Sequence, residues 1–364
     1  MKAYDHAHRA SRAAVDDPGF HQSWFPVALA RELETGVALG VDVLGTRVVV
    51  YRGATGKPVV QSAWCPHLGA DLSIGELVNN QIRCAYHHWR FDEAGVCAHI
   101  PTGDKIPPGA RIFTYPTAEA WGLVWAFNGE QPLFDVPRIP GTEECELAFE
   151  TRLRGIRTVP HWVPTSNGVD FQHLRTLHNL QTGAPDAIEV LDYSIEYCIE
   201  TASYMQHGLI TGTNAFAQHL RRGGADSFML FAGAPVDHQC TRSFFVIGVP
   251  SDGDGDRQSQ IVSEQLQGLR SFVEKLLAED EPILNTMRFK QGVMVASDRH
   301  LSRYFKYVSE FPKFVPLAGR HNLRQGPRGG APPDQRGDYA PPNSGNVNSI
   351  SRGGHDVPDQ HTRP

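Results

Sequence analysis

The sequence has little of several features that would place it in common protein classes. It holds 6 cysteines in 364 residues, too few for a disulfide-stabilised scaffold. No run approaches the roughly 18 to 20 apolar residues that cross a bilayer, and the formal net charge of -6 lacks the positive excess of nucleic-acid binders. Residues 1–20 mix acids, bases and histidines and contain no apolar leader segment. We therefore expect a cytoplasmic protein with no nucleic-acid partner and no membrane partner.

Nucleotide-binding loops are also missing, whereas histidine is abundant. The sequence contains no GxGxxG loop, so any NAD(P)H or flavin chemistry is expected to reside in a separate protein. Histidine occurs 17 times, which directs attention to those histidines that stand at metal-ligand spacing. The length predicts about two domains.

The first part of the chain has the pattern of an all-β domain. Between residues 22 and 60, β-branched residues alternate with other types and glycines interrupt them. Short apolar stretches and turn residues, including the pair Asn79–Asn80, continue this pattern to about residue 130. We predict a β domain over residues 20–135, followed by a proline-rich linker.

The remainder predicts an α+β domain and a tail. Strand-like segments fill residues 187–250, a polar turn or loop is expected over 251–260, and amphipathic helices are expected over 260–290 and 297–311. A sheet followed by helices is typical of α+β domains, which we place at residues 136–320. Residues 321–364 hold seven glycines and seven prolines and few large apolar residues, so a disordered tail is predicted there.

Two cysteines and two histidines form a first candidate metal site. Cys65 and His67 follow the pattern C-x-H, and Cys84 and His87 follow C-x2-H sixteen residues later. A single structural zinc ion is one interpretation of such a donor set. However, each short pair combines one thiolate with one imidazole, and two Cys on one iron with two His on the other is the ligand set of a Rieske 2Fe-2S cluster.

A second constellation lies in the segment NGVDFQHLRTLH. It contains Asn167, Asp170, His173 and His178. Residues five apart lie about 140° apart around a regular helix, so both histidines reach one metal only if the helix distorts or ends between them. A chance pair of histidines is the alternative interpretation.

These motifs resemble the Rieske-type non-haem iron oxygenases. The resemblance covers roughly residues 20–312 and is strongest in the segments CPH, C-x2-H followed by WRFD, the closing WGLVW, and N-x2-D-x2-H-x4-H. It looks most like the aminopyrrolnitrin oxygenase, Rieske monooxygenase and demethylase branches. Ala85 stands where the family commonly has proline and His88 where it commonly has glycine. The spacing assigns His87 as the ligand and His88 as a hydrogen-bonding neighbour.

The resemblance implies a mononuclear Fe(II) site with His173, His178 and a third carboxylate ligand. The family places that carboxylate in E-D-x-x-[IV] segments on a late helix, which carries it to Asp280. Glu279 and Glu281 remain alternatives, and an ordinary solvated run of acids is the plain interpretation. Asp298 is a more distant candidate.

The resemblance further implies an α+β fold, with a Rieske domain followed by a helix-grip catalytic domain, and a homotrimer. Asp170 is expected to bridge His87 of one subunit and His173 of the next. A reductase or ferredoxin would pass electrons from NAD(P)H to the cluster, and O2 would be used to hydroxylate, demethylate or N-oxygenate a small aromatic or cyclic metabolite. A dioxygenase that makes cis-dihydrodiols, an electron-transfer-only Rieske protein and a non-catalytic descendant are the alternatives.

Two other histidines, His207 and His219, lie on expected strands. They could line a substrate pocket, although a structural role is the simpler interpretation. Neither stands at the spacing of a metal-ligand pair.

Overall fold

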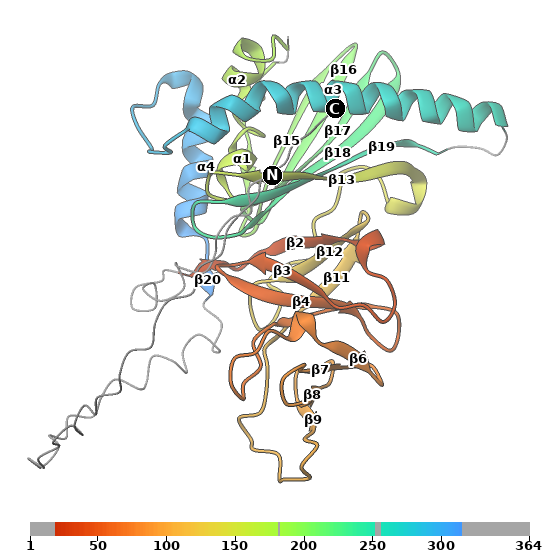
Figure 1. Ribbon diagram of the computed structural model, residues 1–364. Coiled ribbons are helices and arrows are strands. Elements are labelled where there is room, and N and C mark those ends of the chain that lie inside the picture. Colours follow the sequence, from red (N-terminus) through yellow and green to blue (C-terminus); the bar gives the residue numbers. More distant parts are fainter. Residues whose placement is uncertain (1–18, 181–182, 252–255, 315–364) are drawn as a thin grey trace, which may run out of the picture. The chain divides into compact units, whose positions relative to one another are not determined.

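The computed structural model describes residues 19–180, 183–251 and 256–314 (Figure 1). The described residues alternate short strands with four α-helices and belong to the compact unit Met1–Arg324. The predicted tail at 321–364 lies outside the described residues. Among the helices that are described, none is both long and apolar enough to span a bilayer.

The N-terminal part is built from three small antiparallel sheets, in agreement with the predicted β domain. The first sheet has the order β11-β12-β2, with β2 (Trp24–Leu29), β11 (Thr117–Ala120) and β12 (Leu123–Phe127). The second has the order β10-β5-β4-β3, with β3 (Leu39–Val43), β4 (Thr46–Arg52), β5 (Pro58–Ser62) and β10 (Thr114–Tyr115). The third has the order β6-β7-β8-β9, with β6 (Glu76–Val78), β7 (Gln81–Arg83), β8 (Arg90–Phe91) and β9 (Cys97–His99).

The turn expected at Asn79–Asn80 joins β6 to β7. Both asparagines have positive φ, 52° and 60°, which is the backbone conformation of the two central residues in a tight hairpin turn. Asparagine tolerates this conformation better than most side chains. The predicted turn is therefore confirmed.

A seven-stranded antiparallel sheet dominates the second part. Its order is β13-β19-β18-β17-β16-β15-β14, with β13 (Leu147–Arg157), β14 (Glu189–Val190), β15 (Ser194–Thr201), β16 (Tyr204–Thr211), β17 (Ala215–Arg222), β18 (Ala225–Pro235) and β19 (Thr241–Pro250). The helices are α1 (Val163–Ser166), α2 (Phe171–Thr176), α3 (Asp256–Thr286) and α4 (Arg299–Glu310). The predicted α+β class is confirmed.

Alternation along the strands decides which face of this sheet meets the long helix. Met229, Phe245 and Ile247 form a buried cluster with Val273 of α3, so they point toward that helix. Figure 1 shows α3 lying across this sheet. Their strand neighbours Leu230, Phe244 and Val246 belong instead to a cluster with residues of β2 and β12. The first and second parts of the chain thus share one apolar core on the far face of the sheet. The prediction of a polar turn or loop over residues 251–260 is partly wrong, because α3 already begins at Asp256.

The two ends of the described chain meet. Strand β1 (Phe20–His21) pairs antiparallel with β20 (Lys313–Phe314), which follows α4. The short 3-10 helices η1 (Ala30–Glu32), η2 (Leu72–Ile74), η3 (Glu144–Glu146) and η4 (Ala296–Asp298) complete the connections.

Candidate metal centres

The two loops that carry the Cys and His pairs have the same backbone design. In the first, the Cys65 N–H donates to the Ala70 carbonyl (2.9 Å) and the Gly69 N–H donates to the Cys65 carbonyl (2.8 Å). In the second, the Cys84 N–H donates to the Trp89 carbonyl (2.9 Å) and the His88 N–H donates to the Cys84 carbonyl (3.0 Å). Each loop therefore presents its cysteine at the start of a closed turn.

Within these loops the thiols face inward and the imidazoles face outward. Cys65 and Cys84 are 3% and 1% exposed, whereas His67 and His87 are exposed and their ring centroids lie 4.6 Å apart. Burial, together with the neighbouring Cys84 thiol, raises the pKa of Cys65 to about 11. The Cys65 thiol thus stays protonated unless a bound metal stabilises its thiolate.

The donor set fits a cluster with one inner and one outer metal better than a single ion. Across the described ranges, only His173, His178 and Asp280 form a group of three or more candidate ligands whose donor atoms all lie within 4.8 Å of one another. The donor atoms of Cys65, His67, Cys84 and His87 form no such group, although a tetrahedral zinc site requires its donors to lie close to one another. Their separation into buried sulfur and exposed nitrogen matches the chemistry of the Rieske ligand set.

The second constellation is positioned by the short helix α2. Asp170 caps this helix, because its side chain accepts a hydrogen bond from the His173 N–H at 3.0 Å. The helix ends at Thr176, so His178 lies beyond the last turn and its ring comes within 5.1 Å of the His173 ring, centroid to centroid. The expectation that the helix must distort or end between the two histidines is confirmed.

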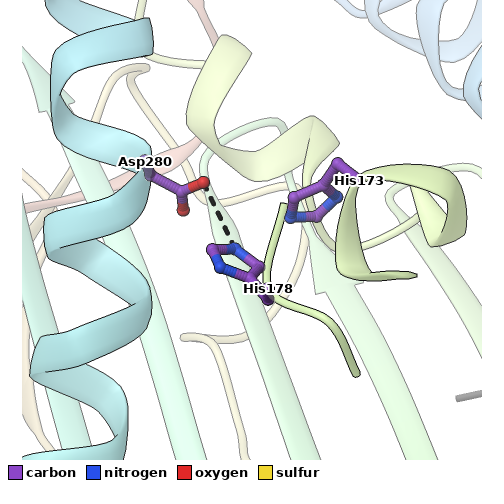
Figure 2. Close-up of side chains that lie close together, drawn as sticks. All are labelled: His173, His178 and Asp280. Carbon is purple, nitrogen blue, oxygen red and sulfur yellow. Dashed lines mark ion pairs between the residues drawn. The ribbon is translucent and has the colours of Figure 1, made fainter. Parts of the chain in front are cut away.

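The long helix α3 supplies the carboxylate that faces these rings. Asp280 Oδ1 lies 3.3 Å from His178 Nε2, and Asp280 Oδ2 accepts a hydrogen bond from the Asn167 amide at 3.3 Å. Figure 2 shows the three side chains converging, with Asp280 from α3 opposite the two histidines. Two imidazoles and one carboxylate are the donor set of the facial triad of non-haem Fe(II) sites.

The neighbouring acids point elsewhere. Glu279 Oε2 lies 2.7 Å from His178 Nδ1, on the other side of the imidazole from Asp280, and Glu281 forms an ion pair with Arg154 at 2.7 Å. Asp298 accepts a hydrogen bond from the Val295 N–H near the start of α4. Of the candidate carboxylates, only Asp280 groups with both histidines.

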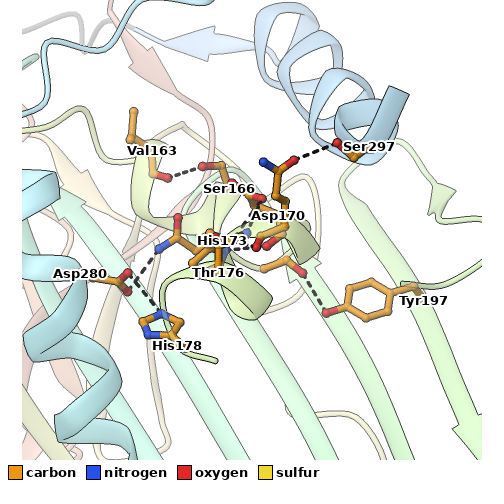
Figure 3. Close-up of polar contacts among 12 residues, drawn as sticks. Val163, Ser166, Asp170, His173, Thr176, His178, Tyr197, Asp280 and Ser297 are labelled. Carbon is orange, nitrogen blue, oxygen red and sulfur yellow. Dashed lines mark hydrogen bonds and ion pairs between the residues drawn. The ribbon is translucent and has the colours of Figure 1, made fainter. Parts of the chain in front are cut away.

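The surroundings of the triad are polar and partly closed. Burial raises the pKa of Asp280, and burial, followed by the repulsion of Arg154, lowers the pKa of the nearby Arg157. Figure 3 shows the hydrogen bonds around this region. They include the bond from the Ser297 hydroxyl of η4 to Gln172 of α2 and the bond from the Tyr197 hydroxyl of the sheet to the Gly168 carbonyl.

The histidines of the expected strands are held away from the triad. His207 and His219 face each other across β16 and β17. His207 pairs with Glu196, and His219 pairs with Asp226 at 2.6 Å and stacks on Phe228, a member of the core on the sheet face opposite α3. Their contacts are those of structural residues.

Sequence reasoning did not foresee the contacts of four side chains. These contacts are the bond from His178 to Glu279, the bond from Asn167 to Asp280, and the hydrogen bond between Gln206 and Gln218. Asn167 stood in the recognised motif, but the two glutamines carry no motif, because they come together only through strand register.

Comparison with known proteins shows what the chain is similar to. Residues 23–116 match the Rieske [2Fe-2S] domain model. Among curated proteins, the chain is 34% identical over 194 residues to cholesterol 7-desaturase nvd of Bombyx mori. This match covers 48% of this chain and 41% of that protein. The chain is 35% identical over 177 residues to aminopyrrolnitrin oxygenase PrnD of Pseudomonas fluorescens, which covers 44% of this chain and 47% of that protein. The matches thus span less than half the length of these relatives.

Solved structures share the fold over most of the chain. NdmB of Pseudomonas putida CBB5 has a TM-score of 0.67 at 21% identity and covers 82% of this chain and 92% of its own. Dicamba monooxygenase bound to dicamba has a TM-score of 0.64 at 21% identity and covers 84% and 100%. The chain carries a Rieske [2Fe-2S] domain and is similar to Rieske-type oxygenases, which confirms the resemblance seen in its motifs.

Proposed function

We propose that this chain is the oxygenase component of a Rieske non-haem iron oxygenase. It uses O2 and electrons from an NAD(P)H-dependent reductase to hydroxylate, demethylate or N-oxygenate a small aromatic or cyclic metabolite. The observation that carries this proposal is the grouping of His173, His178 and Asp280 within 4.8 Å in a chain that also has a Rieske domain.

Each proposed ligand has a residue-level reason. Cys65 and Cys84 would hold the inner iron of the 2Fe-2S cluster, and His67 and His87 the exposed one. His173, His178 and Asp280 would hold a mononuclear Fe(II) and leave one face open. When bound, the cluster supplies electrons and the iron(II) supplies a site for O2.

Asp170 is proposed as the residue that connects the two centres. Its side chain is half-buried, and its carboxylate lies at the start of α2 beside His173. A bridge from this carboxylate to His87 of a neighbouring copy would orient both imidazoles and shorten the electron path. The proposed assembly is a homotrimer in the cytoplasm, with a reductase or ferredoxin as its electron donor.

The substrate class rests on the relatives. The names of these relatives include cholesterol, a 3-ketosteroid and 3-chlorobenzoate, and the structural neighbours bind caffeine and dicamba; all of these molecules are cyclic. A 29% identical relative is a 3-chlorobenzoate-3,4-dioxygenase oxygenase subunit from Comamonas testosteroni, so dioxygenation is the second candidate. An electron-transfer-only protein would have no use for a His173, His178 and Asp280 triad.

Metal analysis and labelled oxygen test the proposal. The purified protein is expected to contain about three irons and two acid-labile sulfides per chain and to give a Rieske EPR signal on reduction. With a reductase and a substrate panel, the product should carry label from 18O2, with one atom for monooxygenation and two for dioxygenation. One zinc ion per chain without sulfide would contradict the proposal.

A further inference from the structure

A chain of hydrogen bonds crosses the seven-stranded sheet on the face that packs against α3. It begins at the Gly168 carbonyl, in the segment between α1 and α2, which accepts from the Tyr197 hydroxyl at 2.8 Å. Tyr197 is bonded to the Gln206 amide nitrogen (3.1 Å), and the same nitrogen is bonded to Gln218 Oε1 (3.0 Å). Tyr204 donates to Gln206 Oε1 at 2.7 Å. Three adjacent strands, β15, β16 and β17, contribute to this chain.

The polarity of this chain is fixed at its start. A backbone carbonyl can only accept, so the single hydroxyl hydrogen of Tyr197 must point at Gly168. The Tyr197 oxygen must then accept from Gln206, whose contacting atom is therefore its amide nitrogen. That nitrogen uses its second hydrogen on Gln218, so the Gln218 atom that faces it is the oxygen. The amide nitrogen of Gln218 is consequently the free end.

The donors at this free end have poor partners within the protein. Among the described residues, the contact of the Gln218 amide nitrogen is Met229 Sδ at 3.6 Å, and a thioether sulfur is a weak acceptor. A primary amide has two N–H donors, and leaving them unpaired inside a protein is costly. Gln218 is therefore prepared to donate to an additional group.

The surface around Gln218 is apolar and only half-covered. Phe216, Leu220 and Phe231 lie on the same face and are half-buried, although they belong to central strands of the sheet. By contrast, Met229, Phe245 and Ile247, which are covered by α3, are fully buried. Phe216, Gln218, Leu220 and Phe231 form a strip on this face. Leu220 and Phe231 pack at the edge of the cluster under α3, and Phe216 packs at the edge of the cluster beneath α2 and α4.

This strip begins at the segment between α1 and α2 that also contacts the metal triad. A Cβ on Gly168 would come within 2.6 Å of the Phe216 ring, so the segment that leads into α2 rests on that ring. The preceding residue, Asn167, donates to Asp280. Gln218 is two residues beyond Phe216 on the same face of β17. The two residues are therefore roughly 7 Å apart, which is about the width of one or two fused rings.

We propose that the strip is the substrate-binding surface and that the Gln218 amide donates to a hydrogen-bond acceptor on the substrate. The substrate class is then a small cyclic molecule that carries an uncharged acceptor, such as a carbonyl oxygen, on the side away from the oxidised position. Molecules that offer only a donor at this point face the Gln218 N–H groups and are disfavoured. This inference rests on the proposed oxygenase function, because it takes the triad as the reacting end.

Matched ketones and hydrocarbons test the inference by binding alone. Iron-loaded protein without O2 or reductant is titrated with 1-indanone and indane, and with 1-tetralone and tetralin, while its tryptophan fluorescence is recorded. The hydrophobic effect favours the hydrocarbons, so tighter ketone binding reports the hydrogen bond. We expect the ketones to bind about tenfold more tightly. No ketone preference in either pair, or no binding of any probe, would overturn the proposal.

Two variants assign the preference to Gln218. Gln218→Leu removes the amide, and Gln218→Glu keeps an oxygen toward Gln206 but replaces the outward donor with an acceptor. Both should lose the ketone preference, while Gln265→Leu, the same substitution at an exposed position of α3, should retain it. A preference that survives in both Gln218 variants would contradict the assignment. Iron, sulfide and 18O incorporation are measured on the same samples, so a failed oxygenase function and a failed Gln218 role give different results.

Discussion

At the scale of single residues, position 88 shows how a sequence departure is accommodated. His88 occupies the same place in the second loop as Gly69 in the first, and both have positive φ, 58° and 75°. This conformation costs a residue with a Cβ roughly 1–2 kcal/mol. His88 therefore adopts the positive φ that the family's usual glycine would adopt at this position, and its N–H still donates to the Cys84 carbonyl.

Replacement of His88 by glycine should consequently stabilise the protein without removing the cluster. Relief of strain is offset by the roughly 0.5–1 kcal/mol of extra chain entropy that glycine brings to the unfolded state, so a net gain of about 0.5–1 kcal/mol is expected. Urea unfolding of His88→Gly measures this, and its Rieske EPR signal should be unchanged. Loss of that signal would instead make His88 a ligand or an essential neighbour of the cluster.

Glu279 is a second residue whose role depends on one contact. Its carboxylate accepts from His178 Nδ1 at 2.7 Å, which leaves the Nε2 lone pair directed toward Asp280. Carboxylates in this position orient metal-binding imidazoles, and their loss typically lowers metal affinity 10–100-fold. We therefore expect Glu279→Leu to weaken Fe(II) binding by that factor, measured by competition with a chelator.

The adjacent acid provides the control for that experiment. Glu281→Leu also removes one negative charge next to Asp280, but Glu281 contacts Arg154 instead of a histidine. It should leave most of the iron affinity intact, and the Rieske signal should be the same in both variants. Equal losses of iron would mean that charge alone, and not the contact to His178, explains the effect.

At the scale of elements, Asp170 has two roles that can be separated. It caps α2 through the His173 N–H, and we propose that it also bridges the two metal centres between subunits. Asparagine caps helices as well as aspartate does, whereas alanine costs about 1 kcal/mol at such a position. Asp170→Asn should thus keep α2, the cluster and the iron but lose most turnover.

Asp170→Ala is the companion variant. It should lose turnover to the same extent and, in addition, about 1 kcal/mol of stability, seen as a lower urea midpoint. Unchanged turnover in Asp170→Asn would remove the bridge, and loss of iron from that variant would make Asp170 part of the iron site itself.

The elements also show what sequence could and could not predict. The turn at Asn79–Asn80 follows from local backbone rules and was predicted. The end of α2 before His178 was expected only on the condition that both histidines reach one metal. Successive residues of α3 point about 100° apart, so Glu279, Asp280 and Glu281 face three directions. Which of them meets the histidines depends on how α3 lies on the sheet, and only the family resemblance selected Asp280. The Gln206–Gln218 contact follows from the register of β16 and β17, which no motif reports.

At the scale of the whole molecule, a buried histidine pair connects the first part of the chain to the second. His21 Nδ1 lies 3.0 Å from His161 Nε2, just before α1, and 3.0 Å from the Thr213 hydroxyl in the turn between β16 and β17. His21 and His161 are 4% and 6% exposed. Lys313 of β20, paired with β1, adds a positive charge, and His238 lies close by.

These surroundings oppose protonation of the pair. Burial, then the charge of Lys313, lowers the pKa of His21 to about 4, and burial, then His21 and His238, lowers the pKa of His161 as well. A histidine whose pKa is lower in the folded state than the usual 6.5 stabilises the fold above pH 6.5. That stability is lost as the pH falls from 6.5 toward 4, because the unfolded chain then binds more protons.

For His21 alone, the free energy of unfolding is expected to fall by about 3 kcal/mol, because its pKa is about 4 in the folded state and 6.5 in the unfolded state. Urea unfolding between pH 7.5 and 4 measures the slope. His21→Gln, which cannot take up the proton but can still hydrogen-bond, should flatten that slope, whereas His99→Gln, at an exposed position of β9, should not. Identical slopes in all three proteins would assign the acid sensitivity to other groups. A flatter slope in His21→Gln alone would assign the acid sensitivity to this buried histidine pair, which joins the first part of the chain to the part that carries the His173, His178 and Asp280 triad.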